Sequence, residues 1–443
     1  MKYALRFAKN AGDYLTGFHE AEFESLCNLF HITNITIEAK NEDIWIVNCD
    51  SQSVIEKLVS RSVFLKTAIK LFCFSNSREE LYIQLQNDSI LSSQIVKYLT
   101  SSENGFKVLI STVNKTLTAS GKIDLIEELL GCLPEFEIQI NLKDPGITLH
   151  LLENYEHEAG CLSHCYLGIS LPCEERSKVM TEFSIKKRHF IGNTTMDPVL
   201  SAAMSNIARV DTGNLVLDPF VGTGGIVLLC AYHGGYCFGS DLDYKTVHGV
   251  SKPSRSGLKG RRRAKDECIR TNFYTHGFEE RFLDVCVNDA CDIFWKNGNI
   301  FDAIVTDPPY GIREGIKMIN SEIKLNSVES HASMQQNSPI EMFKNLVDFA
   351  AKHLKKEGRL VFWMPSLTTL SSFEPDLHIP KHPGMKFVHF CSQTITNTSS
   401  RCLVCLEKIG DDFAEDTKSQ VCVDYYDLGP EVKFRDAYLN SIT

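Results

Sequence analysis

The sequence predicts an α/β protein in which a Rossmann-like, mostly parallel sheet follows an α+β region, and three observations support this fold class. The chain has 443 residues, more than a single core usually holds. After about residue 190, short apolar strands alternate with segments of helical spacing, the order typical of a doubly wound parallel sheet. Near the end, two strand-like segments, 386–395 and 402–407, flank a polar tip and indicate an antiparallel hairpin.

The first region mixes strand and helix patterns without regular alternation. Short apolar runs and apolar residues at helical spacing predict its elements. The expected strands cover residues 3–7, 44–47, 106–110, 136–142 and 147–152, and the expected helices cover 21–30, 53–72, 89–99 and 121–130. The region lacks clustered His, Cys or Asp ligands and a Gly-rich phosphate loop, so it indicates a recognition module.

The second region alternates strands with helices. The expected strands cover residues 215–217, 236–239, 282–287, 303–306 and 359–363, and the expected helices cover 224–232, 262–273 and 339–354. We therefore divide the chain into an α+β region over residues 1–185, an α/β domain over 186–410 and an acidic tail over 411–443.

Composition and charge narrow the class of protein. No run of about 18 apolar residues is present, so we expect no membrane helix. The opening MKYALRFAKN alternates apolar and polar residues, unlike a signal peptide, and favours a cytoplasmic protein. The formal net charge of -10 argues against a protein that coats nucleic acid through its overall field, but it allows a local basic face.

The 16 cysteines are scattered singly through apolar segments. The nearest approach to a metal motif is the pair Cys402 and Cys405, and a zinc ribbon would need a second such pair. Both cysteines lie in an apolar, strand-like run. We therefore expect core thiols, reduced in a cytosolic compartment, and no metal site.

A Gly-rich turn follows the first strand of the α/β region, over Asp218 to Gly225. Such a turn between a strand and a helix lets the backbone approach a ligand closely. The turn departs from the G-x-G-x-x-G dinucleotide pattern, because Gly222 and Gly224 lack the third glycine. Asp218, which opens the turn, suits a ligand with an ammonium group, so we expect S-adenosylmethionine, with Phe220 also in its binding site.

Two further acids close the next strands. Asp241 ends the second strand, where a carboxylate can accept hydrogen bonds from both ribose hydroxyls. Asp289 follows the third strand, where an adenine amino group would lie. Either acid alone is more often a surface residue or helix cap, but acids at successive strand ends predict a nucleoside site.

The fourth strand leads into Asp307-Pro308-Pro309-Tyr310. This tetrad resembles the signature of amino-directed class I methyltransferases, whose seven-stranded sheet ends in an antiparallel hairpin. The Asp307 carboxylate and the Pro308 carbonyl could accept the two N–H bonds of an exocyclic amine and direct its lone pair at a methyl group. Pro308 and Pro309 fix the backbone, and Tyr310 offers a face on which a flipped-out base can stack.

Other segments carry a resemblance that spans nearly the whole chain. They cover residues 6–8, 17–18, 21–26, 106–108, 141–145, 186–197 and 307–313. They are similar to THUMP-containing class I methyltransferases, and in particular to the eukaryotic tRNA guanine-N2 methyltransferase family. The resemblance implies N2-methylation of the guanine at position 10 of tRNA, a THUMP domain that holds the acceptor end, and a small zinc-binding activator subunit on the methyltransferase domain.

Basic residues near the expected active site are candidates for RNA contacts. One cluster is Lys186, Lys187 and Arg188, for which a solvated surface is an equally good explanation. The other contains Arg261, Arg262 and Arg263, which should rim the cofactor cleft where phosphates would pass. Arg313, just after the tetrad, suits a phosphate, the target base or a structural ion pair.

Three alternatives remain. D-P-P-Y also serves methyltransferases that act on adenine N6 in RNA or DNA, although the THUMP-like region disfavours DNA. Glutamine-directed enzymes usually have Asn in place of Asp307. A catalytically inactive tRNA-binding scaffold would retain tRNA but not turn over the cofactor, and the complete set of acids, glycines and tetrad disfavours it.

Overall fold

A computed structural model of the chain provides the structure. It describes residues 1–443 except 9–14, 42, 138, 157–159, 193–194, 251–265, 291–294, 296–297, 311–316, 320–333, 337–338, 368–372, 397–398 and 428–443. Residues 317–319 and 334–336 are described by their backbone alone. No helix among the described residues is long and apolar enough to cross a membrane.

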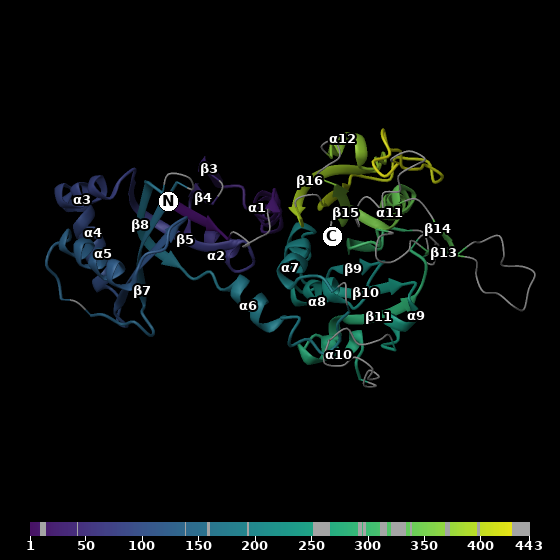
Figure 1. Ribbon diagram of the computed structural model, residues 1–443, viewed down its shortest axis with the longest axis horizontal. Coiled ribbons are helices and arrows are strands. Elements are labelled where there is room, and N and C mark those ends of the chain that lie inside the picture. The colour runs from purple at the N-terminus through teal and green to yellow at the C-terminus, as the bar shows by residue number, and fades with distance from the viewer. Residues whose placement is uncertain are drawn as a thin grey trace, which may run out of the picture. The chain divides into compact units, whose positions relative to one another are not determined.

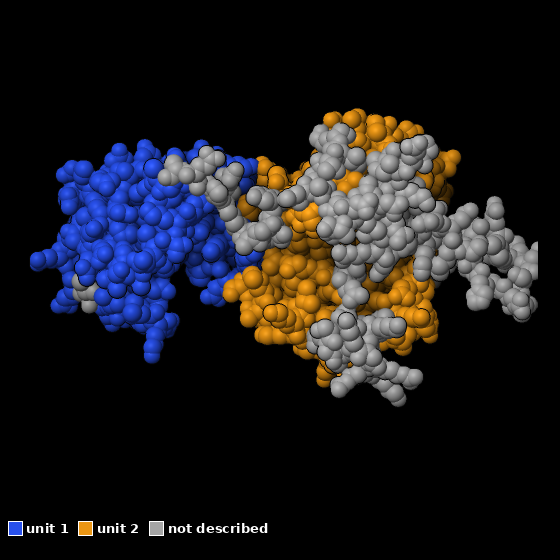
Figure 2. All heavy atoms as spheres, viewed as in Figure 1, with its two compact units in different colours: residues 1–8, 32–176 blue, residues 9–31, 177–443 orange. Residues whose placement is uncertain are grey.

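The chain forms two compact units, coloured separately in Figure 2. The first comprises Met1–Ala8 and Ile32–Arg176, and the second comprises Lys9–His31 and Ser177–Thr443. Their boundary lies between Arg176 and Ser177, before the division at 185/186 that the sequence suggested. The segment Lys9–His31, which sequence patterns assigned to the first region, groups with the second unit.

The first unit is built on a seven-stranded sheet in the order β3-β4-β1-β5-β8-β7-β6. Its neighbouring strands pair antiparallel, except that β6 and β7 are parallel. The strands are β1 (Lys2–Phe7), β3 (Ile35–Lys40), β4 (Ile44–Cys49), β5 (Leu65–Ser75), β6 (Phe106–Val113), β7 (Ile147–Tyr155) and β8 (Leu162–Leu171). The helices are α2 (Gln52–Val59), α3 (Arg78–Asn87), α4 (Ser89–Thr100) and α5 (Ala119–Gly131).

Two of the expected elements in this unit are wrong. The helix expected over residues 53–72 ends at Val59, and its second half is β5, which pairs with β1 and β8 in the middle of the sheet. Long-range pairing overrides the local helical spacing there. The strand expected over 136–142 is reduced, in its described part, to an isolated bridge between Phe106 and Ile140.

The second unit contains an eight-stranded sheet in the order β11-β10-β9-β12-β15-β17-β16-β2. Figure 1 labels β9, β10, β11, β15 and β16 of this sheet. Neighbouring strands from β11 to β15 are parallel, and β17, β16 and β2 pair antiparallel. The strands are β9 (Leu215–Asp218), β10 (Tyr236–Asp241), β11 (Phe282–Val287), β12 (Phe301–Thr306), β15 (Leu354–Leu367), β16 (Met385–Thr394), β17 (Ser399–Lys408) and β2 (Leu15–Thr16). The doubly wound sheet with a terminal hairpin is therefore confirmed, with β2 added at its edge.

Helices and short elements complete this unit. The helices are α1 (Phe18–Leu29), α6 (Glu175–Glu182, which begins at the boundary), α7 (Pro198–Ile207), α8 (Gly225–Tyr232), α9 (Tyr244–Val247), α10 (Ile269–Thr275), α11 (Pro339–His353) and α12 (Pro375–His378). A 3-10 turn, η2, covers Glu279–Arg281, and β13 (Lys317–Ile319) pairs with β14 (Met334–Gln336) in a separate ribbon. The expected helix over 339–354 matches α11.

The described part of the C-terminal segment belongs to the core of the second unit. Tyr425 and Tyr426 are buried and pack against the same apolar cluster as β15. The Tyr425 hydroxyl accepts a hydrogen bond from the Leu367 backbone N–H, and the Tyr426 hydroxyl donates to the Pro365 carbonyl. These two tyrosines thus anchor the described part of the segment to the packed domain, while most of its other residues are exposed.

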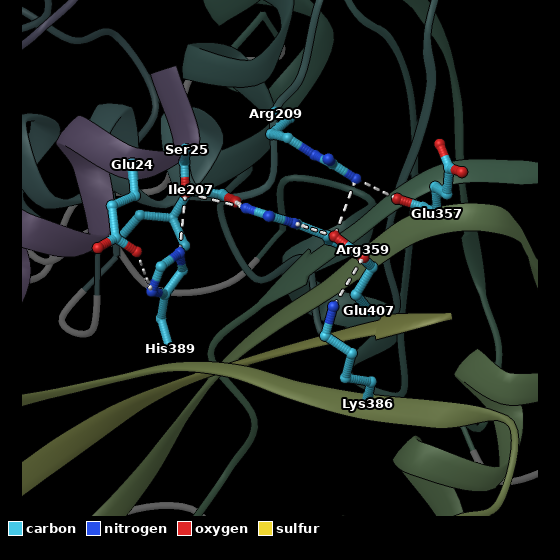
Figure 3. Close-up of polar contacts among 9 residues, drawn as sticks. All are labelled: Glu24, Ser25, Ile207, Arg209, Glu357, Arg359, Lys386, His389 and Glu407. Carbon is cyan, nitrogen blue, oxygen red and sulfur yellow. Dashed lines mark hydrogen bonds and ion pairs between the residues drawn. The ribbon is translucent and has the colours of Figure 1, made fainter. Parts of the chain in front are cut away.

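A buried ion pair fastens helix α1 to the second unit (Figure 3). The Arg359 side chain on β15 is 2% exposed and its Nε lies 3.0 Å from a carboxylate oxygen of Glu407 on β17. Its Nη1 donates to the Ser25 hydroxyl of α1 at 2.9 Å and to the Ile207 carbonyl of α7 at 2.8 Å. One guanidinium therefore ties two strands and two helices together.

A second buried contact reinforces the same junction. Glu22 of α1 is 1% exposed and accepts a hydrogen bond of 2.7 Å from the Asn206 amide of α7. The aromatic ring of Phe18 lies 5.8 Å from that of Trp363 on β15. Buried polar groups demand partners, so these contacts fix the position of α1 as well as its burial.

Replacing Arg359 with Met is expected to lower the free energy of unfolding of the second unit by about 3 kcal/mol, because it removes one partner of a buried ion pair. Lys355→Met is a matched control, since Lys355 is 47% exposed in its ion pair with Asp302 and should contribute less than about 1 kcal/mol. Urea unfolding of the two variants measures the difference. Equal midpoints would contradict the structural role of Arg359.

Candidate active site

Acidic residues converge at the carboxyl edge of the parallel strands in the second unit. Asp218 ends β9, Asp241 ends β10 and Asp307 follows β12 directly. Strand β9 lies between β10 and β12, in register that pairs Asp218 with Gly239 and Leu217 with Ile304. Ligands of such sheets bind outside the carboxyl ends of the strands, so these acids mark the candidate site.

Asp218 is buried beneath the Gly-rich turn, with 1% of its surface exposed. The Thr306 hydroxyl and the Phe220 backbone N–H both donate to its Oδ1. The pKa of Asp218 is nevertheless raised to about 7, mainly by burial. The two hydrogen bonds lower this pKa, and the nearby carboxylates of Asp241 and Asp307 raise it. A cationic ligand would favour its charged form.

The backbone of the Gly-rich turn adopts conformations that suit glycine. Gly222 and Gly224 have φ values of 49° and 75°, and a Cβ on Gly224 would lie 2.6 Å from the Ile269 side chain. The Gly222 N–H donates to Asp241 Oδ2 at 2.9 Å, so the turn and the end of β10 are joined. Burial also raises the pKa of Asp241.

Asp289 and Phe220 occupy the rim of this site. Asp289 is 4% exposed, and the backbone N–H of the preceding Asn288 donates to the Asp241 carbonyl at 3.1 Å. Asp289 thus follows β11 by two residues and lies close in sequence to a contact with the end of β10. The partly buried ring of Phe220 packs on the same apolar cluster as that of Tyr310.

The tetrad forms the turn that leaves β12. The Tyr310 hydroxyl donates to Asp307 Oδ1, so the two ends of the tetrad are linked. Burial raises the pKa of Asp307, while the Arg401 guanidinium and the Tyr310 hydroxyl act in the opposite direction. Pro308 is buried, and Pro309 and Tyr310 are partly exposed.

Sequence reasoning missed Arg401, which contacts the tetrad from the terminal hairpin, and the two residues that hold it, Gln393 on β16 and Trp363 on β15. Arg401 on β17 lies 3.7 Å from Asp307 Oδ2, its guanidinium carbon lies 4.1 Å from the Trp363 ring centroid, and Gln393 accepts a hydrogen bond from it. An antiparallel strand beside parallel ones begins at their carboxyl edge. The first residues of the predicted last strand could therefore have been assigned to the site.

The segment before α7 packs on the Gly-rich turn. The hydroxyls of Thr195 and Thr223 are 2.9 Å apart, and a Cβ on Gly225 would lie 3.1 Å from the Arg188 guanidinium. Arg188 is 1% exposed and donates to the Phe183 carbonyl. A buried guanidinium in this position does not contact RNA phosphates, so Arg188 is removed from the expected RNA-binding residues.

The other expected RNA-binding residues have two outcomes. Lys186 and Lys187 are exposed, which is compatible with phosphate contacts. Arg261, Arg262, Arg263 and Arg313 lie outside the described residues.

The cysteine pair of the last strand has the environment of core thiols. Cys402 and Cys405 are 2% and 1% exposed on β17, and burial raises the pKa of each to about 11. Their spacing of three residues in a strand directs the side chains to opposite faces of the sheet. Among the described residues, no group of three or more His, Cys, Asp or Glu side chains could hold a metal ion.

Comparison with known proteins identifies both units. Residues 186–392 match the family model described as the RMKL-like methyltransferase domain, and residues 1–175 match the Tmrp11 THUMP N-terminal domain. The human tRNA (guanine(10)-N(2))-methyltransferase TRMT11 is 37% identical over 413 residues, which cover 90% of this chain and 87% of the human protein. The chain belongs to the TRMT11 family.

Further proteins are similar to this chain. The rat TRMT11 protein is 36% identical over 439 residues, covering 96% of this chain and 92% of the rat protein. Among solved structures, TrmN from Thermus thermophilus is similar with a TM-score of 0.46 and 18% identity, covering 92% of this chain and 100% of TrmN. The family assignment confirms the resemblance inferred from the sequence.

The affinity for S-adenosylmethionine is expected to fall as the pH drops through about 7, because protonation removes the negative charge of Asp218 that favours a cationic ligand. The limiting slope is about tenfold per pH unit. Titration calorimetry on both sides of this pH measures it. Asp218→Asn should bind weakly at every pH and show no such slope, whereas a slope retained in that variant would assign the dependence to another group.

Proposed function

We propose that this chain transfers a methyl group from S-adenosylmethionine to the exocyclic N2 of the guanine at position 10 of tRNA. The observation that carries this proposal is the Asp307–Tyr310 tetrad, which leaves β12 next to the buried Asp218 at the carboxyl edge of the sheet. Membership of the TRMT11 family supports guanine in tRNA as the substrate.

The donor set at the carboxyl edge fits S-adenosylmethionine. Asp218 would face its ammonium group, Asp241 its ribose hydroxyls and Asp289 its adenine amino group, with Gly222 and Gly224 allowing close approach. Two buried carboxylates whose pKa values are raised fit a cationic ligand better than an anionic one. The cofactor supplies an electrophilic methyl group at this site.

The tetrad can orient the amine that receives the methyl group. An exocyclic guanine amine is a weak nucleophile because its lone pair is shared with the ring. Asp307 and the Pro308 carbonyl accept its two N–H bonds, which directs the lone pair away from the ring plane. Asp307 then takes the proton that the amine loses, and Tyr310 stacks against the base.

The first unit supplies the tRNA-binding surface in this proposal. It matches a THUMP N-terminal domain, and Lys186 and Lys187, near the start of the methyltransferase match, would add tRNA contacts from the second unit. Arg261, Arg262, Arg263 and Arg313 remain candidates for contacts with phosphates or the target base.

We also propose that a small zinc-binding activator subunit docks on the edge of the catalytic sheet. Strand β11 is the terminal strand of the described sheet, and it pairs with β10. Leu283 and Val287 project from one face of β11 and are 45% and 42% exposed. An open strand edge with apolar side chains favours pairing with another chain.

Replacing Asp307 with Ala is expected to abolish methylation, because the target amine loses its acceptor, while the affinity for S-adenosylmethionine changes little. Methyl transfer from labelled cofactor to unmodified tRNA, with nucleoside analysis of the product, measures the reaction. N2-methylguanosine from the unaltered protein at a single position supports the proposal. Methylated adenosine would transfer the assignment to adenine N6, and bound but unmodified tRNA would favour an inactive scaffold.

The double variant Leu283→Lys, Val287→Lys is expected to lose co-purification with the activator subunit, because two charges replace apolar side chains at the strand edge. Ile409→Lys is a matched control, since Ile409 is 49% exposed at the end of the terminal hairpin. Co-expression followed by size-exclusion chromatography measures the complex. Retention of the complex by the double variant would exclude this edge.

A further inference from the structure

Arg401 reaches the tetrad from a part of the chain that is distant in sequence. It lies near the start of β17, opposite Pro365 of β15 and Gln393 of β16. Its Nη1 is 3.7 Å from Asp307 Oδ2, while Asp307 Oδ1 accepts the hydrogen bond from the Tyr310 hydroxyl. The two oxygens of this carboxylate therefore have different neighbours.

The Arg401 side chain is held on three sides. Its Nε donates to Gln393 Oε1 at 2.7 Å, and its guanidinium carbon lies 4.1 Å from the Trp363 ring centroid. Its Nη2 lies 3.6 Å from the Met196 sulfur, and 17% of the side chain is exposed. An exposed arginine would lose much conformational entropy on pairing, whereas this guanidinium is already oriented by its neighbours.

Several charged and titratable groups lie around Asp307. Tyr310 comes from its own turn and Arg401 from β17. Asp218 on β9 is affected by the charges of both Asp307 and Asp241 on β10, so these carboxylates are close enough to repel one another. The positive charge of Arg401 lies beside Asp307 and offsets its negative charge.

We propose that Arg401 is a positioning residue that keeps Asp307 ionised and oriented, so that the carboxylate can accept the N–H of the target amine. This inference rests on the proposed function. Protonation would turn one oxygen of Asp307 into a donor, which weakens its grip on the N–H of the amine, and it would remove the base that takes the amine proton. Each carboxylate oxygen can accept more than one hydrogen bond, so Tyr310 and Arg401 leave acceptor capacity for the substrate.

Burial and Arg401 act on Asp307 in opposite directions. Burial raises its pKa and the Arg401 guanidinium lowers it. Activity that requires the ionised carboxylate falls as the pH drops through this pKa. Removal of Arg401 lets the pKa rise, so the acidic limb of the pH profile must move to higher pH.

The test compares Arg401→Met with Arg401→Lys in the complete protein, with its activator if that is required. The acidic limb of kcat/KM for tRNA, measured at saturating S-adenosylmethionine so that protonation of Asp218 does not limit the rate, is expected to move upward by about one pH unit or more in Arg401→Met, as for a carboxylate that loses an adjacent Arg. Arg401→Lys retains the charge and should keep the limb near its original pH, even if kcat falls. Gln393→Leu should reduce kcat, because the Arg401 guanidinium loses the hydrogen bond that helps to orient it.

Two controls separate this role from a structural one. Lys386→Gln removes a cation that is 60% exposed on β16 of the same hairpin, and its profile should match that of the unaltered protein. S-adenosylmethionine binding by Arg401→Met, measured by calorimetry well above the acidic limb, should change less than about threefold, since Asp218 and Asp241 remain.

The outcomes distinguish the inference from the proposed function. If the unaltered protein forms N2-methylguanosine and the acidic limb of Arg401→Met stays in place, Arg401 does not act through Asp307 and the inference is wrong. An equal shift in Arg401→Lys would also overturn it, because the charge is retained there. Failure of the unaltered protein to methylate guanine would instead overturn the proposed function.

Discussion

The burial of several carboxylates at one edge of the parallel sheet is the constraint on which the site depends. Asp218 and Asp307 lie at the ends of β9 and β12, where burial raises both pKa values. Like charges in a desolvated site repel, so each requires partners. The Thr306 hydroxyl donates to Asp218, while the Tyr310 hydroxyl and the Arg401 guanidinium face Asp307; the backbone N–H of Gly222 donates to the neighbouring Asp241. The fold thus gathers carboxylates at this edge and offsets their repulsion with a small set of donors and one guanidinium.

The parts of this site that sequence reasoning located are those encoded by short segments. The Gly-rich turn, Asp241 and the tetrad each follow a strand directly, and the alternation of strands and helices places such strand ends at one edge. Arg401 was missed because its contact with Asp307 depends on the antiparallel pairing of β17 with β15. Arg188 was misassigned because a basic run suggests an exposed surface, whereas packing buries its third member.

The fold was predictable to a similar extent. The α/β unit and its terminal hairpin follow from the spacing of apolar residues and from the order of the expected strands and helices. The second half of the segment 53–72 is β5 and not helix, since pairing with β1 and β8 outweighs its helical spacing. The membership of α1 in the catalytic unit has no local signal. It depends on partners such as Arg359 and Asn206, which lie 334 and 184 positions further along the chain than the residues of α1 that they contact. Helical periodicity identifies α1 as amphipathic without indicating what it covers.

The attachment of α1 to the catalytic unit has a consequence for biosynthesis. Ser25 contacts His389, a partner 364 positions away, at 3.3 Å. During translation, residues 32–176 can form their sheet once they have emerged, because their contacts lie within that range and the first eight residues. Helix α1 can contact α7 once residues 198–207 have emerged, but its contacts with β15 and β16 form only after nearly the whole chain has been made. The helix synthesised first therefore completes its packing among the last, and part of its surface stays uncovered during much of elongation.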